Sequence, residues 1–285
     1  MAMTRSVVVG VDGSPQSLGA ARFGAALAGR RGLAVRLLHG YLHPFGYGSL
    51  SLSAYDPAVP DPRPEARRML ADAVAMVRSE HPSVDVSAAQ VAAGGAAALV
   101  EASGEAAAVV VGHRGLGGFA ELVLGSVGSQ VAAHASCPVV VVRPQETERG
   151  GAPVVVGVDG SVTGDAALAF AFEEAAARSV PLVAVHVATD PTDGAAAYTE
   201  SLLASTVAPW TAKHPDVEFG LHVRPGIDAE EALVDASADA CLVVVGSRGR
   251  GGFTGLLLGS VSQALVHHAR CPVAVVHPGA PDPAS

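Results

Sequence analysis

Lysine is nearly absent from this chain of 285 residues: the only one is Lys213, in the polar segment TAKHPD. A phosphate-binding site that uses a lysine is therefore excluded in the rest of the chain, and arginine is the side chain left to bind phosphate there. Basic residues are outnumbered by acidic ones: the chain has 18 Lys and Arg residues and 27 Asp and Glu residues, for a formal net charge of −9. This balance argues against extended nucleic acid or an anionic membrane as the main partner.

Cysteine, aromatic residues and long apolar runs are also scarce. Cys137, Cys241 and Cys271 form an odd set without a C-x-x-C pair, which predicts reduced, packed thiols in a cytoplasmic protein. Aromatic residues make up 4% of the chain, so the expected cores are aliphatic. The apolar runs span about five to seven residues, too few to cross a bilayer, and no secretory leader precedes the strand-like VVVGV. We therefore expect no membrane insertion.

The sequence contains one unit twice. The octapeptide VVVGVDGS at 7–14 returns at 154–161. The loop GHRGLGGFAELVLGS at 112–126 returns as GSRGRGGFTGLLLGS at 246–260, with 10 of 15 positions identical. Such a duplication predicts two copies of one domain, each carrying the same loop.

The spacing of the repeats sets the expected boundaries. The offset between the copies is 147 residues at the start and 134 at the loop, so the first copy carries about 13 extra residues. We assign them to the Pro-, Gly-, Ser- and Tyr-rich segment 40–66, which is either a lid over the ligand or a surface loop. The predicted organisation is a domain at 1–144, a linker at 145–152, a domain at 153–278 and a flexible tail at 279–285.

Strand-like and helix-like segments alternate in each copy. The unbroken apolar run CLVVVG at 241–246 is typical of a central parallel strand covered on both faces. Ala20, Phe23 and Leu27 recur at helical spacing and should face the sheet. Ser14 and Ser161 are placed to cap the first helix of each copy. The pattern predicts an α/β fold of two tandem Rossmann-like domains, each a five-stranded parallel sheet with helices on both faces.

The repeated glycine loop lies between a central strand and a helix, where open parallel sheets bind ligands. Glycines let the backbone approach a ligand, and the N–H groups that open the helix at Ser126 or Ser260 suit a phosphate. Arg114, Arg248 and Arg250 can add charge-assisted hydrogen bonds. Asp12 and Asp159, which end the first strand of each copy, can accept sugar hydroxyls. These parts describe a nucleotide site, and the alternative is a tight turn with serine helix caps.

Two common phosphate-binding motifs do not account for the loop. The Walker A pattern G-x-x-x-x-G-K-[S/T] is missing together with its lysine, and GVDGSP lacks the G-x-G-x-x-G spacing. The spacing Gly112-x2-Gly115-x9-Gly125-Ser126, repeated as Gly246-x2-Gly249-x9-Gly259-Ser260, instead resembles the G-2x-G-9x-G-[S/T] signature of the ATP-binding branch of the universal stress protein family. The VVVGVDGS openings and the CPVVVV and CPVAVV endings resemble the same family.

The likeness covers nearly the whole chain, twice, and is similar to the tandem-domain universal stress proteins of actinobacteria. It implies an adenine nucleotide alpha hydrolase-like fold with an ATP site in each crevice and Mg²⁺ bound through the phosphates. It also implies that the last strands of the two domains pair within the chain, with a homodimer as a further arrangement. We therefore expect those strands, VVVVR and VAVVH, to meet antiparallel.

The resemblance also implies the residues that contact ATP. In the first copy these are Gly10, Val11, Asp12, Gly40, Gly112, Arg114, Gly115, Gly117, Gly118, Gly125, Ser126 and Val127. In the second copy they are Gly157, Val158, Asp159, Val187, Asp190, Gly246, Arg248, Gly249, Arg250, Gly251, Gly252, Gly259, Ser260, Val261 and Ser262. The first copy has Gly128 in place of Ser262, so we expect it to hold the terminal phosphates less firmly.

Histidines invite a metal or catalytic interpretation that the sequence does not complete. His134, His267 and His268 lack partners at metal-ligand spacing, so we expect no protein-bound metal. His113 is Ser247 in the second copy, which argues against an essential base.

Two functions are compatible with the sequence. One is a module that binds ATP and signals to protein partners, not identified by the sequence, during stress or dormancy. The other is a slow ATP hydrolase, which needs groups to position water and to neutralise transition-state charge. The only carboxylate inside the loop motif, Glu121, is Gly255 in the second copy, and no catalytic residue is assigned. The sequence favours the binding module.

Overall fold

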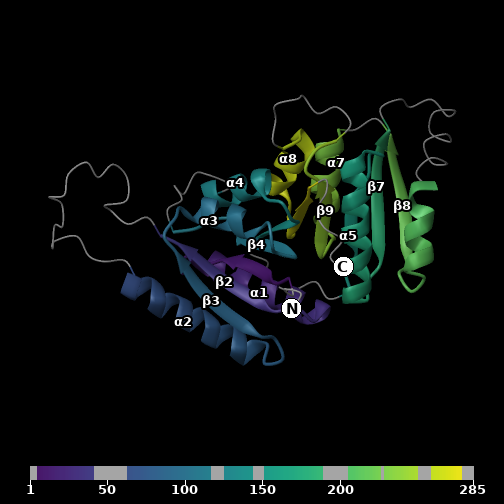
Figure 1. Cartoon of the computed structure of the whole chain (residues 1–285). Coiled ribbons are helices and arrows are strands. Elements are labelled where there is room, and N and C mark those ends of the chain that lie inside the picture. The colour runs from purple at the N-terminus through teal and green to yellow at the C-terminus, as the bar shows by residue number, and fades with distance from the viewer. Residues whose placement is uncertain are drawn as a thin grey trace.

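The computed structural model describes residues 5–41, 63–116, 125–143, 151–188, 205–225, 228–249 and 258–277. They form two α/β halves that lie side by side and share one ten-stranded sheet (Figure 1). The strands are β1 (Val7–Gly10), β2 (Val35–Gly40), β3 (Val86–Val91), β4 (Ala108–Gly112), β5 (Val139–Val142), β6 (Val154–Gly157), β7 (Leu182–Ala188), β8 (Phe219–Pro225), β9 (Leu242–Gly246) and β10 (Val273–Val276).

The order of the strands is β3-β2-β1-β4-β5-β10-β9-β6-β7-β8. Each half is parallel, and the order reverses direction between β1 and β4 and between β6 and β9. A crevice at the carboxyl ends of the strands forms at such a reversal, because the connections diverge to opposite sides. The expected five-stranded parallel sheet is therefore confirmed in both domains.

Helices cover both faces of the sheet because the central strands are apolar on both faces. The helices are α1 (Pro15–Arg31), α2 (Arg63–Glu80), α3 (Gly95–Ala102), α4 (Ser126–His134), α5 (Val162–Arg178), α7 (Ala229–Ala236) and α8 (Ser260–His268), with a further helical stretch at 205–213. One core cluster joins the sheet to α1, α2 and α5, and the other joins it to α3, α4, α7 and α8. Each cluster runs through both domains, so each face of the sheet has a core that continues from one domain into the other.

The first helix of each domain begins where the sequence predicts. The Ser14 hydroxyl accepts a hydrogen bond from the Ser17 N–H, with Pro15 in the first turn, and the Ser161 hydroxyl accepts one from the Gly164 N–H. These caps satisfy N–H groups that the helix cannot pair internally. Each helix therefore starts at a fixed point directly behind the end of β1 or β6.

The two domains meet at the last strand of each. β5 pairs antiparallel with β10, with Val140 opposite Ala274 and Val141 opposite Val273. All eight residues of these two strands are buried. The predicted pairing is confirmed, and each strand covers the edge that the other would leave open.

Several expectations concern residues outside the described ranges. They include most of the segment 40–66, most of the linker and the tail. Within the described residues, every helix is too short or too polar to span a membrane.

Candidate functional site

A cavity of about 470 Å³ opens at the carboxyl ends of β1, β2 and β4 in the first domain. Its walls come from the ends of these strands, the first turns of α3 and α4 and the loop after β4. The residues that line it are Gly10, Val11, Asp12, Ser17, Leu38, His39, Gly40, Gly95, Leu99, Val111, Gly112, Arg114, Gly115, Gly125, Ser126, Val127 and Gly128. Ten of the twelve positions expected in this copy therefore lie around one cavity, and the other two, Gly117 and Gly118, lie outside the described residues.

The Asp12 carboxylate holds the glycine loop in place. Its Oδ1 accepts a hydrogen bond from the Ser14 N–H at 3.0 Å, and its Oδ2 accepts one from the Leu116 N–H at 2.8 Å. Burial raises the pKa of this carboxyl, but the hydrogen bonds from Ser14 and Leu116 outweigh it and lower the pKa below its ordinary value. Asp12 is therefore anionic at neutral pH and already bound to the loop.

This contact explains why the loop needs a glycine at its fourth position. A Cβ on Gly115 would lie 2.3 Å from Asp12 Oδ2, closer than any real contact. The second domain repeats the arrangement, since a Cβ on Gly249 would lie 2.6 Å from Asp159 Oδ2. Asp159 Oδ1 accepts hydrogen bonds from the Ser161 N–H and hydroxyl at 2.9 and 2.6 Å.

The other loop glycines allow two close approaches within the protein. A Cβ on Gly112 would lie 2.9 Å from the carbonyl group of Gln16 in α1. The N–H of Gly125 donates to the His113 carbonyl at 2.8 Å, and that of Gly259 donates to Ser247 at the same distance. The loop thus closes on itself just before the helix, and its end is fixed against its beginning.

The start of α4 is left open toward the cavity. Gly125 is the N-cap and makes no side-chain cap, and Ser126 is the first helical residue, with an exposed side chain. Gly259 and Ser260 repeat this arrangement at α8. Serine capping, the alternative reading of these residues, is therefore wrong, because a glycine occupies the cap position. The first N–H groups of each helix remain able to bind an anion.

Arg114 adds a cation to this end of the cavity. It lines the cavity, and its Nε is buried without a hydrogen-bond partner among the described residues. A buried guanidinium N–H without a partner is costly, so its position favours an anionic ligand. In the second domain Arg248 holds the equivalent position and is exposed.

The second domain places most of the expected residues at the same points of the fold. Gly157 ends β6, and Val158 and Asp159 follow it. Val187 lies in β7, Gly246 ends β9, and Arg248 and Gly249 follow β9. Gly259, Ser260, Val261 and Ser262 form the start of α8. Asp190, Arg250, Gly251 and Gly252 lie outside the described residues.

The Ser262 hydroxyl makes contacts within the protein, whereas the sequence led us to expect it to bind a phosphate. Its side chain is buried, and its Oγ lies 3.1 Å from the Ser247 carbonyl oxygen and 2.9 Å from that of Gly259. The hydroxyl therefore ties α8 to the loop. Its counterpart Gly128 lines the first cavity, so the first copy lacks a bond within the protein at this point.

The two copies also differ at the far end of the cavity, where β2 ends. A Cβ on Gly40 would lie 2.7 Å from the Gly95 Cα, because the end of β2 touches the start of α3. The second copy has Val187 and Ala229 at the corresponding positions. This end of the second crevice therefore carries side chains where the first has bare backbone.

Seven residues that line the cavity were not among the expected site residues: Ser17, Leu38, His39, Gly95, Leu99, Val111 and Gly128. The pair Gly94-Gly95 before a helical segment could have predicted that the backbone at this point lies close to another part of the chain. The position of Leu99 depends on how α3 packs, and no local pattern announces it. His39 Nδ1 lies 2.7 Å from the Val11 carbonyl oxygen, and His186 repeats this contact with Val158.

The cysteines and the remaining histidines do not add a second site. Cys137 and Cys271 are buried and form no disulfide among the described residues, and burial raises the pKa of the Cys137 thiol to about 12. Its thiolate is therefore too rare at neutral pH for reactive chemistry. Among the described residues, no three His, Cys, Asp or Glu side chains are grouped to hold a metal ion.

Comparison with known proteins identifies the family. The model of the universal stress protein family matches the chain twice, over residues 3–143 and 152–277. The chain belongs to the universal stress protein family. A universal stress protein of Mycobacterium tuberculosis strain H37Rv is 38% identical over 291 residues, covering 94% of this chain and 96% of the relative. One from Mycolicibacterium smegmatis is 36% identical over 289 residues, covering 95% and 97%.

A solved structure confirms the tandem architecture of this family member. The universal stress protein from Archaeoglobus fulgidus DSM 4304 superposes with a TM-score of 0.73 at 19% identity, over 97% of this chain and all of that chain. At this identity the likeness concerns the fold alone.

Proposed function

We propose that this universal stress protein binds ATP in the crevice of each domain and acts as a nucleotide-dependent signalling or regulatory module in stress or dormancy. The observation that carries the proposal is the buried Arg114 Nε without a described partner, in a cavity of about 470 Å³ beside the uncapped start of α4. A guanidinium and free helical N–H groups form a suitable receptor for a phosphate chain.

The ligand would lie with its phosphates at Gly125, Ser126 and Arg114 and its nucleoside toward Gly10 and Gly40. Asp12 would act by fixing the loop and by accepting a ribose hydroxyl. Mg²⁺ would be held mainly by the phosphates, because the described residues group no set of protein ligands for it. The equivalent positions of the second domain support a second molecule of ATP.

Hydrolysis is the weaker alternative. The carboxylate that lines the described cavity is Asp12, and it already accepts N–H groups from Ser14 and Leu116. It is thus poorly placed to position water, and Glu121 lies outside the described residues. Buried thiols that form no disulfide among the described residues fit a protein of the cytoplasm, where its protein partners would be found.

Calorimetric titration of nucleotide-stripped protein with ATP tests the proposal. Arg114→Met should weaken binding at the first site about 10- to 100-fold, the effect of losing a charged hydrogen bond. Arg22→Met is the matched control, because Arg22 lies in α1 with its side chain half exposed and pairs with Glu80 away from the cavity. Equal ATP affinity in Arg114→Met and in the control would contradict the assignment of Arg114.

A further inference from the structure

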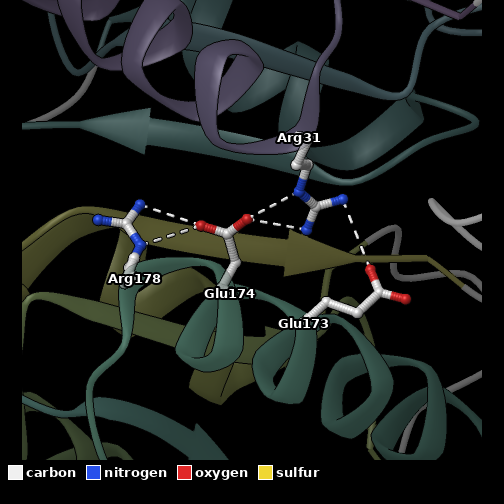
Figure 2. A network of polar contacts seen from close by, with 4 residues as sticks. All are labelled: Arg31, Glu173, Glu174 and Arg178. Carbon is white, nitrogen blue, oxygen red and sulfur yellow. Dashed lines mark hydrogen bonds and ion pairs between the residues drawn. The ribbon is translucent and has the colours of Figure 1, made fainter.

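A buried ionic network crosses the boundary between the two domains. Arg31 ends α1 in the first domain, and Glu173, Glu174 and Arg178 belong to α5 in the second (Figure 2). Glu174 is fully buried, and both arginine side chains are only 11% exposed. The network therefore forms part of the domain interface.

Glu174 uses each of its two oxygens for a different domain. Its Oε1 lies 3.0 Å from Arg31 Nε and 2.8 Å from Arg31 Nη2. Its Oε2 lies 3.0 Å from both Arg178 Nε and Arg178 Nη2. One carboxylate thus bridges two guanidinium groups, and each guanidinium donates a hydrogen bond from its Nε to a different oxygen, with its Nη2 at ion-pair distance from the same oxygen (Figure 2).

The two arginines are counterparts in the duplicated units. The offset of 147 residues relates Arg31 to Arg178 and Phe23 to Phe170. Arg31 lies 4.9 Å from the ring centre of Phe170, and Arg178 lies 5.2 Å from that of Phe23. These two cation–π contacts obey the pseudo-twofold symmetry of the domain pair and would form equally well between two identical domains.

The carboxylate breaks this symmetry. The counterpart of Glu174 is Leu27, which is 1% exposed, and the counterpart of Glu173 is Ala26. The described part of the interface therefore holds two equivalent arginines, and one carboxylate, that of Glu174, bridges them. Removing one partner from a buried ionic group is strongly unfavourable, because the remaining charge stays desolvated.

We infer that this surface selects its partner: the α1 face of the first domain fits a second domain that supplies one buried carboxylate, and it rejects another first domain. Two first domains paired this way would bury two copies of Arg31 with two leucines and no carboxylate. Two second domains would direct two copies of Glu174 into a space that one already fills. The partner is the second domain of the same chain, whose Glu174 lies against Arg31.

Moving the carboxylate between the domains tests this inference in the full chain. Glu174→Leu should speed amide hydrogen exchange in β5 and β10 about a hundredfold relative to β2 and β7, because Arg178 loses the carboxylate that it pairs with and Arg31 keeps only the longer contact with Glu173, at 3.5 Å. The double variant Leu27→Glu/Glu174→Leu places the carboxylate at the counterpart position. It should bring the rate of amide hydrogen exchange in β5 and β10 back to within about tenfold of the wild-type rate, because the two arginines are related by the pseudo-twofold symmetry.

Glu80→Leu is the control, since Glu80 pairs with Arg22 at the exposed surface. It should leave exchange in β5 and β10 unchanged. If Glu174→Leu does not fold, Glu174→Gln keeps the shape and removes the charge, and it should still speed exchange. The inference is overturned if the Glu174 variants exchange like the wild type, or if the double variant is no better than Glu174→Leu.

Discussion

Asp12, which follows β1, is linked to the glycine loop by the hydrogen bond that its Oδ2 accepts from the Leu116 N–H, next to Gly115. Gly115→Ala would place a methyl group 2.3 Å from Asp12 Oδ2 and force the loop away from its position. We expect this variant to weaken ATP binding at the first site by about tenfold or more, the effect of losing one charged hydrogen bond from Asp12. Titration calorimetry measures the effect, with Gly19→Ala as the control, because a Cβ on Gly19 meets nothing within 4 Å.

Removing the carboxylate tests the same contact from the other side. Asp12→Ala should also weaken the first site, and Asp159→Ala the second, because each loop loses its anchor. Combining Asp12→Ala with Gly115→Ala should cost less than the sum of the single losses, since the clash disappears with the carboxylate. Fully additive losses would show that the two residues act independently.

Four histidines give the folded state a predictable response to acid. Burial lowers the pKa of His113, His214, His267 and His277 below the ordinary value of 6.5. Because the unfolded chain takes up these protons first, stability is highest above pH 6.5 and falls as the pH drops below it. Asp12 acts in a lower pH range. Because its pKa is lowered in the folded state, the stability that its ionised form contributes is present above pH 3.8 and is lost as the pH falls below that value.

Denaturant unfolding at pH 7.5 and at pH 5.5 measures this response. His277 is the residue to replace, because it follows β10 and burial is the main cause of its low pKa. His277→Gln should narrow the difference in stability between the two pH values, since glutamine does not titrate. An equal difference in the variant and the wild type would contradict the assignment to His277.

At the scale of elements, the duplicated helices α1 and α5 end in the same left-handed turn with different residues. Gly32 follows α1 with φ of 64°, and Ser179 follows α5 with φ of 54°. A residue with a Cβ is strained there, whereas glycine is not. Ser179→Gly should raise the free energy of unfolding by about 1 kcal/mol, and Gly32→Ser should lower it by a similar amount. Thermal or urea unfolding measures both, and a stabilising Gly32→Ser would refute the explanation.

The elements themselves were largely predictable from the sequence. Apolar runs such as CLVVV and the repeated Ser14 and Ser161 caps depend on local patterns, and the structure follows them. The site was only partly predictable, because distances across the fold decide the rest. The need for Gly115 arises from Asp12, about a hundred residues earlier, and the bonds of Ser262 depend on how α8 meets the loop. The burial of Glu174 was missed for the same reason, since a glutamate on a helix is most often exposed.

At the scale of the whole molecule, one sheet and two core clusters join two copies of the universal stress protein domain that are no longer identical. The first cavity has bare backbone at Gly40 and Gly95, and the second crevice has Val187 and Ala229 there. Val187 should add apolar contact with a base, so we expect Val187→Gly to weaken the second site while leaving the first unchanged. Calorimetry in the Arg114→Met background isolates the second site, and unchanged affinity would place Val187 away from the ligand.

The central claim is that each domain binds one ATP. Native mass spectrometry of nucleotide-stripped full-length protein with added ATP tests it most directly, because it counts ligands on a folded chain. The account predicts two ATP molecules on the wild type, one on Arg114→Met and none on the Arg114→Met/Arg248→Met double variant. Folded wild-type protein that stays free of ATP at millimolar nucleotide, or an Arg114→Met variant that still carries two, would contradict it.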